Sequence, residues 1–147
     1  MEDSVMWVAL LHAASTLILV GIIWTVQLVH YPLMALVRPE GFVAYEAAHA
    51  PRMAAVVALP WGVQGLTTLA LLLAPPPGVP GGLIIAAAIA AAVPVLVTVI
   101  ASVPAHAKLS RGFDATVHRR LVRTNWLRTA AWTVHVPIAL AIVVRAG

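Results

Sequence analysis

The sequence contains no cysteine and few charged residues of either sign. Of its 147 residues, five are acidic and nine are Lys or Arg, so charged residues make up 10% of the chain. The lack of cysteine excludes disulfides, thiolate metal sites, iron–sulfur clusters and a cysteine nucleophile. Hydrophobic residues make up 62%, and the mean hydropathy of +0.98 exceeds what a soluble domain of this length can hide. The sequence therefore predicts a membrane protein.

Four apolar stretches dominate the chain, and about 20 helical residues suffice to cross a hydrocarbon core. The stretches are Val5 to Val29, Met53 to Ala74, Gly82 to Val103 and roughly Thr129 to Val144. The fourth is shorter, but its helix can begin earlier. We predict an all-α fold, a single four-span membrane bundle over residues 1–147 with short cytoplasmic helical segments. Counted this way, no acidic residue falls inside a span. The acidic start and the long apolar run indicate a retained first helix and not a signal peptide.

Basic residues gather between spans three and four. The segment from Pro104 to Arg128 carries six of them against the single acidic Asp114, whereas the turn at 75–82 is neutral and rich in proline and glycine. The positive-inside rule then places both polar connections in the cytoplasm and both termini outside. Because these cations lie at a membrane boundary, we expect the bilayer as their partner and no nucleic acid. The composition leaves a homo-oligomer open.

Proline and capping residues mark the expected helix ends. Pro32 is expected to kink or end helix one, and helix three is expected to stop near Pro104. Residues 41–52 have helical spacing, so this segment either lies along the interface or extends helix two. Asp114 is a candidate N-cap for a last helix that runs to about Val144.

Each helix brings one histidine to the cytoplasmic level, namely His30, His49, His106 and His118. Three converging imidazoles can hold iron, copper or zinc with an open position. We predict His30, His49 and His106 as ligands of a transition metal, with His118 as a fourth ligand or proton carrier. The alternative is that these side chains only bind loop carbonyls at the headgroup boundary. The sequence has neither HExxH nor a pair of Glu-x-x-His motifs.

The last helix carries a polar stripe, because its polar residues recur at spacings of three, four and seven. The stripe consists of His118, Asn125, Arg128, Thr129, Trp132 and His135. Lipid cannot solvate such a stripe, so it should face the bundle interior. We predict catalytic roles for His118, Asn125 and Arg128, the last two orienting a substrate or an oxyanion. The alternative for Arg128 is that it snorkels to lipid phosphates.

Deeper polar and aromatic residues suggest a pocket. Trp24, Trp61, Gln64 and Trp132 come from three helices at related depths and could line a site for a flat lipophilic molecule, although tryptophan also packs bundles. His12 is expected toward the outer side and His135 nearer mid-depth. At about 1.5 Å per residue their offset is of order 10 Å, which disfavours a single haem held between them, so haem is less expected here than the transition metal at the cytoplasmic histidines.

Several runs carry a family resemblance. VPAHAKLSRGFDATVHRRLVRTNWLRTAAW, read with QLVHYPL and FVAYEAAH-x-x-R, resembles a group of small bacterial four-helix membrane proteins of undefined activity. More distantly, the layout resembles the anthrone-oxygenase-like family, in which asparagine more often stands at the place of His106. The resemblance implies a shared site made from His30, His49, His106, Asn125 and Arg128. It also implies a multi-pass protein of the cell inner membrane.

Two hypotheses of function follow. The first is an integral-membrane oxidoreductase or oxygenase-like enzyme that acts on a small lipophilic molecule through a histidine-bound metal at the cytoplasmic face. The alternative is a non-catalytic membrane protein that binds or transports an ion, haem or anionic metabolite through the same polar site. A structural subunit whose histidines only settle loops is a third reading.

Overall fold

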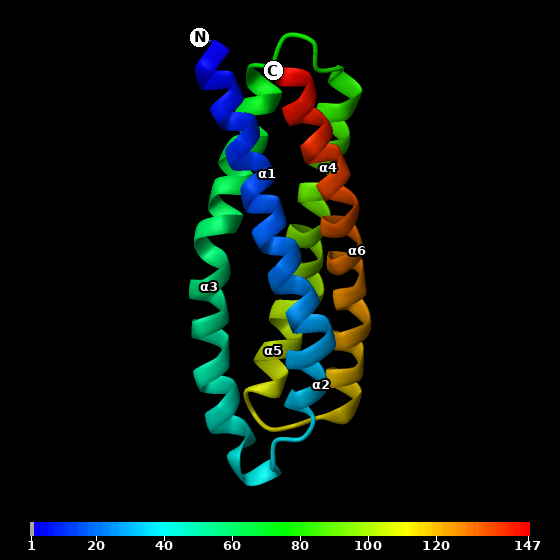
Figure 1. The fold of residues 1–147 in the computed structure, drawn as a ribbon. Coiled ribbons are helices and arrows are strands. Elements are labelled where there is room, and N and C mark those ends of the chain that lie inside the picture. The colour runs from blue at the N-terminus through cyan, green and yellow to red at the C-terminus, as the bar shows by residue number, and fades with distance from the viewer. Residues whose placement is uncertain (1) are drawn as a thin grey trace.

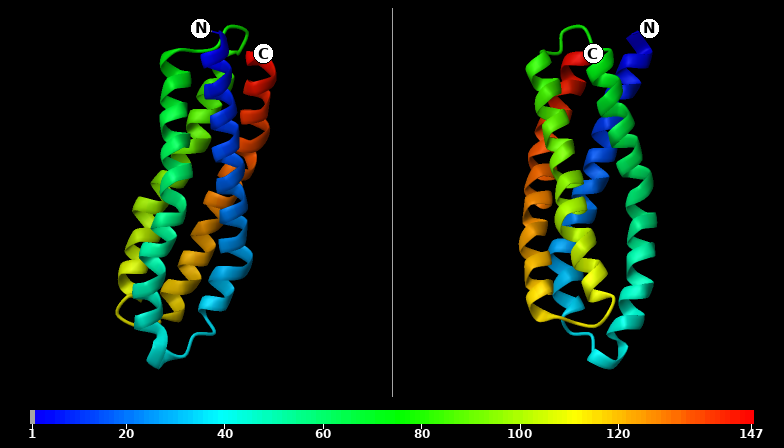
Figure 2. Two further views of the ribbon diagram at one scale, coloured as in Figure 1. Left: turned by 60° about the vertical axis from the view of Figure 1, so that its left-hand side comes forward. Right: turned by 180° about the vertical axis from the view of Figure 1, so that it is seen from behind.

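Four long helical rods run side by side, up and down, in the computed structural model, which describes residues 2–147 and the side chains from Ser4 onward (Figure 1). The rods are α1 (Glu2–Thr25) with η1 (Val26–His30) and α2 (Tyr31–Met34); α3 (Pro39–Leu73); α4 (Gly81–Val97) with η2 (Thr98–Ser102) and α5 (Val103–Leu109); and α6 (Ala115–Ala146). All four are long and apolar enough to cross a membrane. The start of α1 and the end of α6 lie at one end of the bundle, and the α2–α3 and α5–α6 connections lie at the other (Figure 2).

The second rod begins earlier than the apolar pattern alone suggested. Residues 41–52 extend helix two, so α3 is one continuous helix that starts with Pro39 in its first turn. This start places Glu46, which is 1% exposed, inside a candidate span. The expectation that no acidic residue falls inside a span is therefore wrong, because it counted the span only from Met53.

Two π-helical turns let the first and third rods continue past proline. The turn Val26–His30 precedes Pro32, and the turn Thr98–Ser102 precedes Pro104 at the same offset. Proline lacks an N–H and its ring crowds the preceding turn, and a wider turn relieves both problems. The third rod therefore continues to Leu109 and does not stop near Pro104. A π turn adds one residue to the helix, so it also rotates the side chains that follow it, including Tyr31 and His106.

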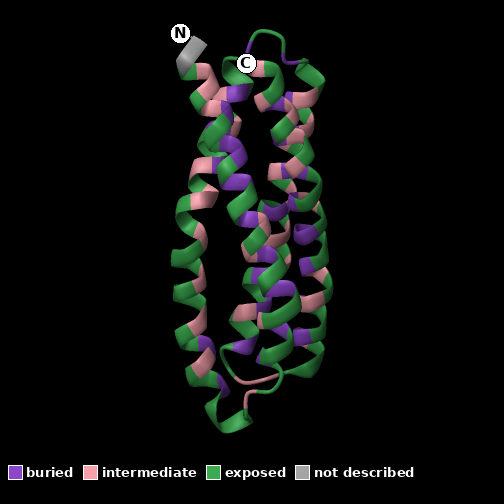
Figure 3. Ribbon diagram, in the orientation of Figure 1, coloured by how far each residue is buried: buried purple, intermediate pink, exposed green. Residues whose placement is uncertain are grey.

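The polar stripe of α6 faces the bundle interior, as predicted. All six of its residues are buried. Figure 3 shows that buried residues follow the inner faces of the helices. Of the four rods, α3 is the least buried. Asp114 caps the helix, because its Oδ1 accepts hydrogen bonds from the backbone N–H groups of Thr116 at 2.7 Å and Val117 at 3.0 Å. These bonds, the one from Val117 foremost, hold the pKa of the Asp114 carboxyl below its usual range.

His12 and His135 meet in the half of the bundle nearer the termini. Their Nε2 atoms lie 3.0 Å apart, and both side chains are fully buried. The expected offset of about 10 Å is wrong, because α6 runs to Ala146 and places both rings at nearly the same distance from that end of the bundle. Two histidine nitrogens that bind one iron from opposite sides lie about 4 Å apart. The 3.0 Å contact between His12 and His135 therefore leaves no room for a haem iron between them.

One donor sets the direction of the hydrogen bonds around this pair. The Trp132 indole N–H, which can only donate, binds Gln64 Oε1 at 3.0 Å. The Gln64 amide nitrogen must then donate, to Thr16 Oγ1 at 2.8 Å and to His135 Nδ1 at 3.5 Å. His135 Nδ1 is therefore an acceptor, and its proton lies on Nε2.

The same logic continues across the pair. His135 Nε2–H donates to His12 Nε2, so the proton of His12 lies on Nδ1 and donates to Thr67 Oγ1 at 3.0 Å. Thr67 in turn donates to the Val63 carbonyl at 2.8 Å. One assignment of protons satisfies every member with both imidazoles neutral. The network joins α1, α3 and α6 through hydrogen bonds that the surrounding apolar groups cannot replace.

We predict that Gln64→Leu lowers the free energy of unfolding by about 2 kcal/mol, because it leaves the Trp132 N–H and His135 Nδ1 buried without partners. Thermal unfolding in detergent, followed by circular dichroism, measures the change. Leu69→Ala, on the exposed face of the same helix, is the control and should change the free energy by less than about 0.5 kcal/mol. Equal stability of Gln64→Leu and the unchanged protein would contradict the network's role.

Candidate metal centre and its cavity

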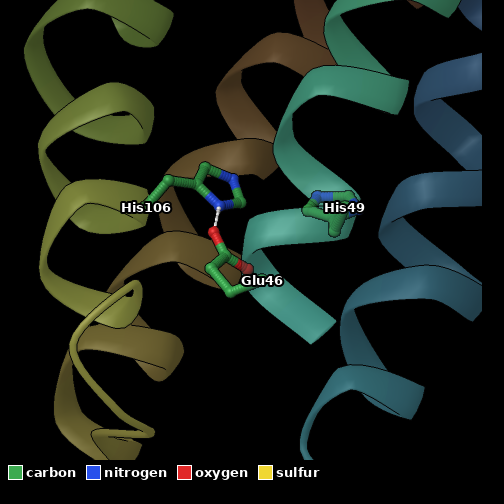
Figure 4. Close-up of side chains that lie close together, drawn as sticks. All are labelled: Glu46, His49 and His106. Atoms are coloured by element: carbon green, nitrogen blue, oxygen red, sulfur yellow. Dashed lines mark hydrogen bonds and ion pairs between the residues drawn. The ribbon is translucent and has the colours of Figure 1, made fainter. Parts of the chain in front are cut away.

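A carboxylate and two imidazoles converge at the end of the bundle away from the termini. Glu46 and His49 are three residues apart on α3 and so share a face, and His106 comes from α5. Each offers a ligand atom, and these atoms all lie within 4.8 Å of one another. Figure 4 shows His106 meeting Glu46, with His49 one turn farther along α3. This group could hold a metal ion.

The Glu46 carboxylate is held on one oxygen only. Its Oε1 accepts a hydrogen bond from His106 Nδ1 at 2.6 Å, which is also an ion pair when the imidazole is protonated. Its Oε2 is buried and has no hydrogen-bond partner. A buried carboxylate oxygen without a partner is costly, so a ligand that binds Oε2 would be stabilised at this position.

The three histidines predicted as ligands lie next to one another. The His30 ring stacks on the His49 ring with centroids 4.2 Å apart, and His49 and His106 are 5.5 Å apart. However, the converging ligand atoms belong to Glu46, His49 and His106. His30 lies behind His49, with its Nε2 3.3 Å from the Tyr45 hydroxyl.

Sequence reasoning missed Glu46 because it treated residues 31–52 as a polar connection. The available signal was the single Glu46-x-x-His49 motif, whose spacing places both side chains on one helical face. The sequence does not repeat this motif, so the pair that is typical of two-metal helical bundles does not occur. One motif suffices here because the third group comes from another helix.

The residues predicted to be catalytic occupy three settings. His118 Nε2 lies 2.8 Å from the Tyr31 carbonyl oxygen and joins α6 to α2. Asn125 donates to Gln27 Oε1 at 2.8 Å, so its own Oδ1 is free to accept from Arg128 Nη1 at 3.2 Å. Arg128 also lies over two indole rings, with Cζ 5.9 Å from the Trp61 centroid and 5.4 Å from the Trp132 centroid.

The four residues predicted to line a pocket divide into two sets. Trp61 and Trp132 line a cavity and pack edge to face with centroids 5.6 Å apart. Gln64 lies in the hydrogen-bond network behind Trp132. Trp24 lies on the bundle surface, where its indole donates to Thr133 at 3.1 Å.

The cavity has a volume of about 500 Å³ and connects the metal-ligand group to Arg128. Its polar wall carries Glu46, His49, Ser102, His106 and Arg128, and much of the remainder is aliphatic or tryptophan. Among the described side chains, three buried polar atoms lack a hydrogen-bond partner: Glu46 Oε2, Ser102 Oγ and Arg128 Nε. All three belong to residues of this cavity wall. The wall therefore presents unused acceptors and donors to whatever fills it.

A directed hydrogen-bond chain crosses the cavity wall. The Glu46 carboxylate can only accept, so His106 Nδ1 carries the proton that meets its Oε1 at 2.6 Å. His106 Nε2 then accepts from the Tyr31 hydroxyl, 3.4 Å away. Such a chain can carry a proton between the cavity and the carboxylate.

Comparisons with protein-family models, with curated proteins and with solved structures found no match for this chain. Function must therefore be inferred from the chemistry of the site itself.

The absence of native cysteine allows a direct test of the convergence of α3 and α5. We predict that the double variant Glu46→Cys, His106→Cys is joined by a short bifunctional thiol reagent, because the native side chains meet at 2.6 Å. The joined chain should migrate faster on a denaturing gel than the open form. The pair Arg52→Cys, His106→Cys is the control, since Arg52 is exposed and lies about 240° around α3 from Glu46. Equal joining of both pairs would contradict the site geometry.

Proposed function

We propose that this chain is an integral-membrane oxidoreductase or oxygenase-like enzyme that acts on a small lipophilic molecule, with a transition metal held by Glu46, His49 and His106. The observation that carries the proposal is a set of two histidines and one carboxylate on the wall of a cavity. Two histidines and one carboxylate with open positions are the ligand set of non-haem iron oxygenases.

The proposal places the metal group at the cytoplasmic face of the cell inner membrane, with both termini outside. The supporting observation is the charge of the α5–α6 end. Lys108, Arg111, Arg119, Arg120 and Arg123 are all exposed there, around the end of the bundle that holds the group. Exposed cations on short loops favour the cytoplasmic side and contact anionic lipid headgroups.

The residues around the cavity take distinct roles in this proposal. A redox-active metal would supply the oxidising chemistry. Glu46, His49 and His106 would hold that metal, and His106 would give up one of its two hydrogen bonds, to Tyr31 or to Glu46, when a ring nitrogen binds it. Arg128, held by Asn125, binds a developing oxyanion. His118 is a positioning residue, because it fixes the backbone of Tyr31.

We predict that the purified protein binds Fe(II), and that Glu46→Gln and His49→Ala each weaken its binding by at least about tenfold, because each removes one of three ligands. Metal content after dialysis against micromolar Fe(II) measures the loss. Glu40→Gln is the matched control, since it makes the same chemical change at an exposed position of the same helix.

The state of the bound iron tests the open coordination position. Nitric oxide, added without oxygen, should bind the Fe(II) protein and give the electron paramagnetic resonance signal of a nitrosyl iron centre. Iron that does not react with nitric oxide would contradict an oxygenase-like site. Tight zinc in place of iron would favour a hydrolytic site, and no metal at all would leave Glu46 and His106 as a simple hydrogen-bonded pair.

The membrane orientation gives a separate prediction. A periplasmic reporter fused after Gly147 should be active, and the same reporter inserted near Gly112 should be inactive, because the exposed cations keep the α5–α6 connection in the cytoplasm. A cytoplasmic reporter at the same two positions is the control and should give the opposite pattern. The reverse result would move the metal group to the outer face.

A further inference from the structure

Arg128 is a buried cation whose described partners are all neutral. It is 9% exposed, donates to Asn125, interacts electrostatically with the Tyr31 side chain, and lies over two tryptophan rings. In the part of the chain that the structure describes, no carboxylate forms an ion pair with it. Its Nε atom is buried and has no hydrogen-bond partner, and Arg128 lines the cavity. Neutral groups orient a guanidinium but do not balance its charge, so the cavity favours an anionic group beside Arg128.

Glu46 does not fill this role. Its Oε1 already pairs with His106, and the proposed function uses its carboxylate as a metal ligand. A divalent metal, one carboxylate and one guanidinium together leave positive charge in the cavity. The charge at the site therefore also favours a substrate with an acidic oxygen.

A second hollow adjoins the cavity on the side of α1 and α3. It has a volume of about 460 Å³, lies between α1 and α3, and shares Ile22, Val26 and Met53 with the cavity. Its outer lining includes Leu17, Ile18 and Val56, each about half exposed. In the proposed membrane placement these side chains face lipid. An apolar molecule could thus pass between bilayer and cavity by displacing only the side chains of the shared wall.

From these two hollows and the unbalanced Arg128 we infer that the substrate is an elongated lipid-soluble acid that enters from the bilayer between α1 and α3. Its acidic oxygen binds Arg128, and its apolar tail lies along the shared wall into the α1–α3 hollow. This inference rests on the proposed function in one respect, namely that the bound acid is a substrate. Binding of the acid itself does not depend on the metal. The bound acid lies one side chain from the metal group, because Tyr31 contacts both Arg128 and His106.

The test uses a fluorescent fatty acid, cis-parinaric acid, and its uncharged methyl ester as a matched probe. Both are titrated against the full chain in lipid nanodiscs, with empty nanodiscs as the baseline. The acid should bind the unchanged protein at least about tenfold more tightly than the ester, as a charge-assisted hydrogen bond requires. Arg128→Gln should bind both probes equally, and Arg123→Gln, which removes an exposed cation from the same helix, should keep the preference.

The α1–α3 route is tested at Gly21, which lines the second hollow and where a new side chain meets open space. Gly21→Phe should fill the hollow and lower the affinity of the protein for both probes by about tenfold, because the new side chain takes the place of the apolar tail. Gly62→Phe is the control, because Gly62 is also exposed, also has open space, and lines neither hollow. Unchanged binding to Gly21→Phe would overturn the route.

Equal affinity for the acid and the ester, or no saturable binding of either, would overturn the inference without the need for any variant. The metal content of the same samples separates this failure from that of the proposed function. Bound iron with no preference for the acid would refute the acidic substrate and leave the metal site standing. Preference for the acid without any metal would support the acid site and refute the metal-dependent enzyme.

Discussion

The bundle depends on one constraint: in apolar surroundings, a buried polar group needs a partner from the protein. In the half nearer the termini, every buried side-chain polar atom that the structure describes has a hydrogen-bond partner. The donor-only indole of Trp132 fixes Gln64, Gln64 fixes His135, and His135 fixes His12, so each proton has one place. These bonds tie three helices together and set the rotation of α6. The same rotation aims Arg128 and Asn125 at the interior on the other side of Trp132.

In the half nearer the α5–α6 connection, some buried polar atoms have no hydrogen-bond partner. We therefore interpret the half nearer the termini as a structural network and this half as a candidate binding site. Glu46, Ser102 and Arg128 each keep one buried polar atom without a partner, and all three line the same cavity. The two π turns themselves contribute Val26, Thr98 and Ser102 to the cavity wall, and they lie before Tyr31 and His106. Such turns are common at functional sites, because they re-aim side chains without ending the helix.

Much of the fold could be predicted from the sequence, and the candidate site only in part. Apolar length predicted the four helices, and the periodicity of α6 predicted which of its residues are buried, because burial within an apolar helix follows directly from spacing. Glu46 was not predicted, since its burial depends on α3 starting at Pro39. The contact of His12 with His135 was not predicted either, because relative depth depends on where each helix ends.

The sequence by itself determined an all-α chain with four helices able to cross a membrane, an N-cap at Asp114 and a polar stripe that must avoid lipid. These properties are local, since they follow from composition and spacing within one segment. The tertiary structure decided which groups meet. It brought Glu46, rather than His30, to the ligand group, and among the described side chains it paired Arg128 with no carboxylate. Those outcomes depend on the register and rotation of four packed helices, which no single segment encodes.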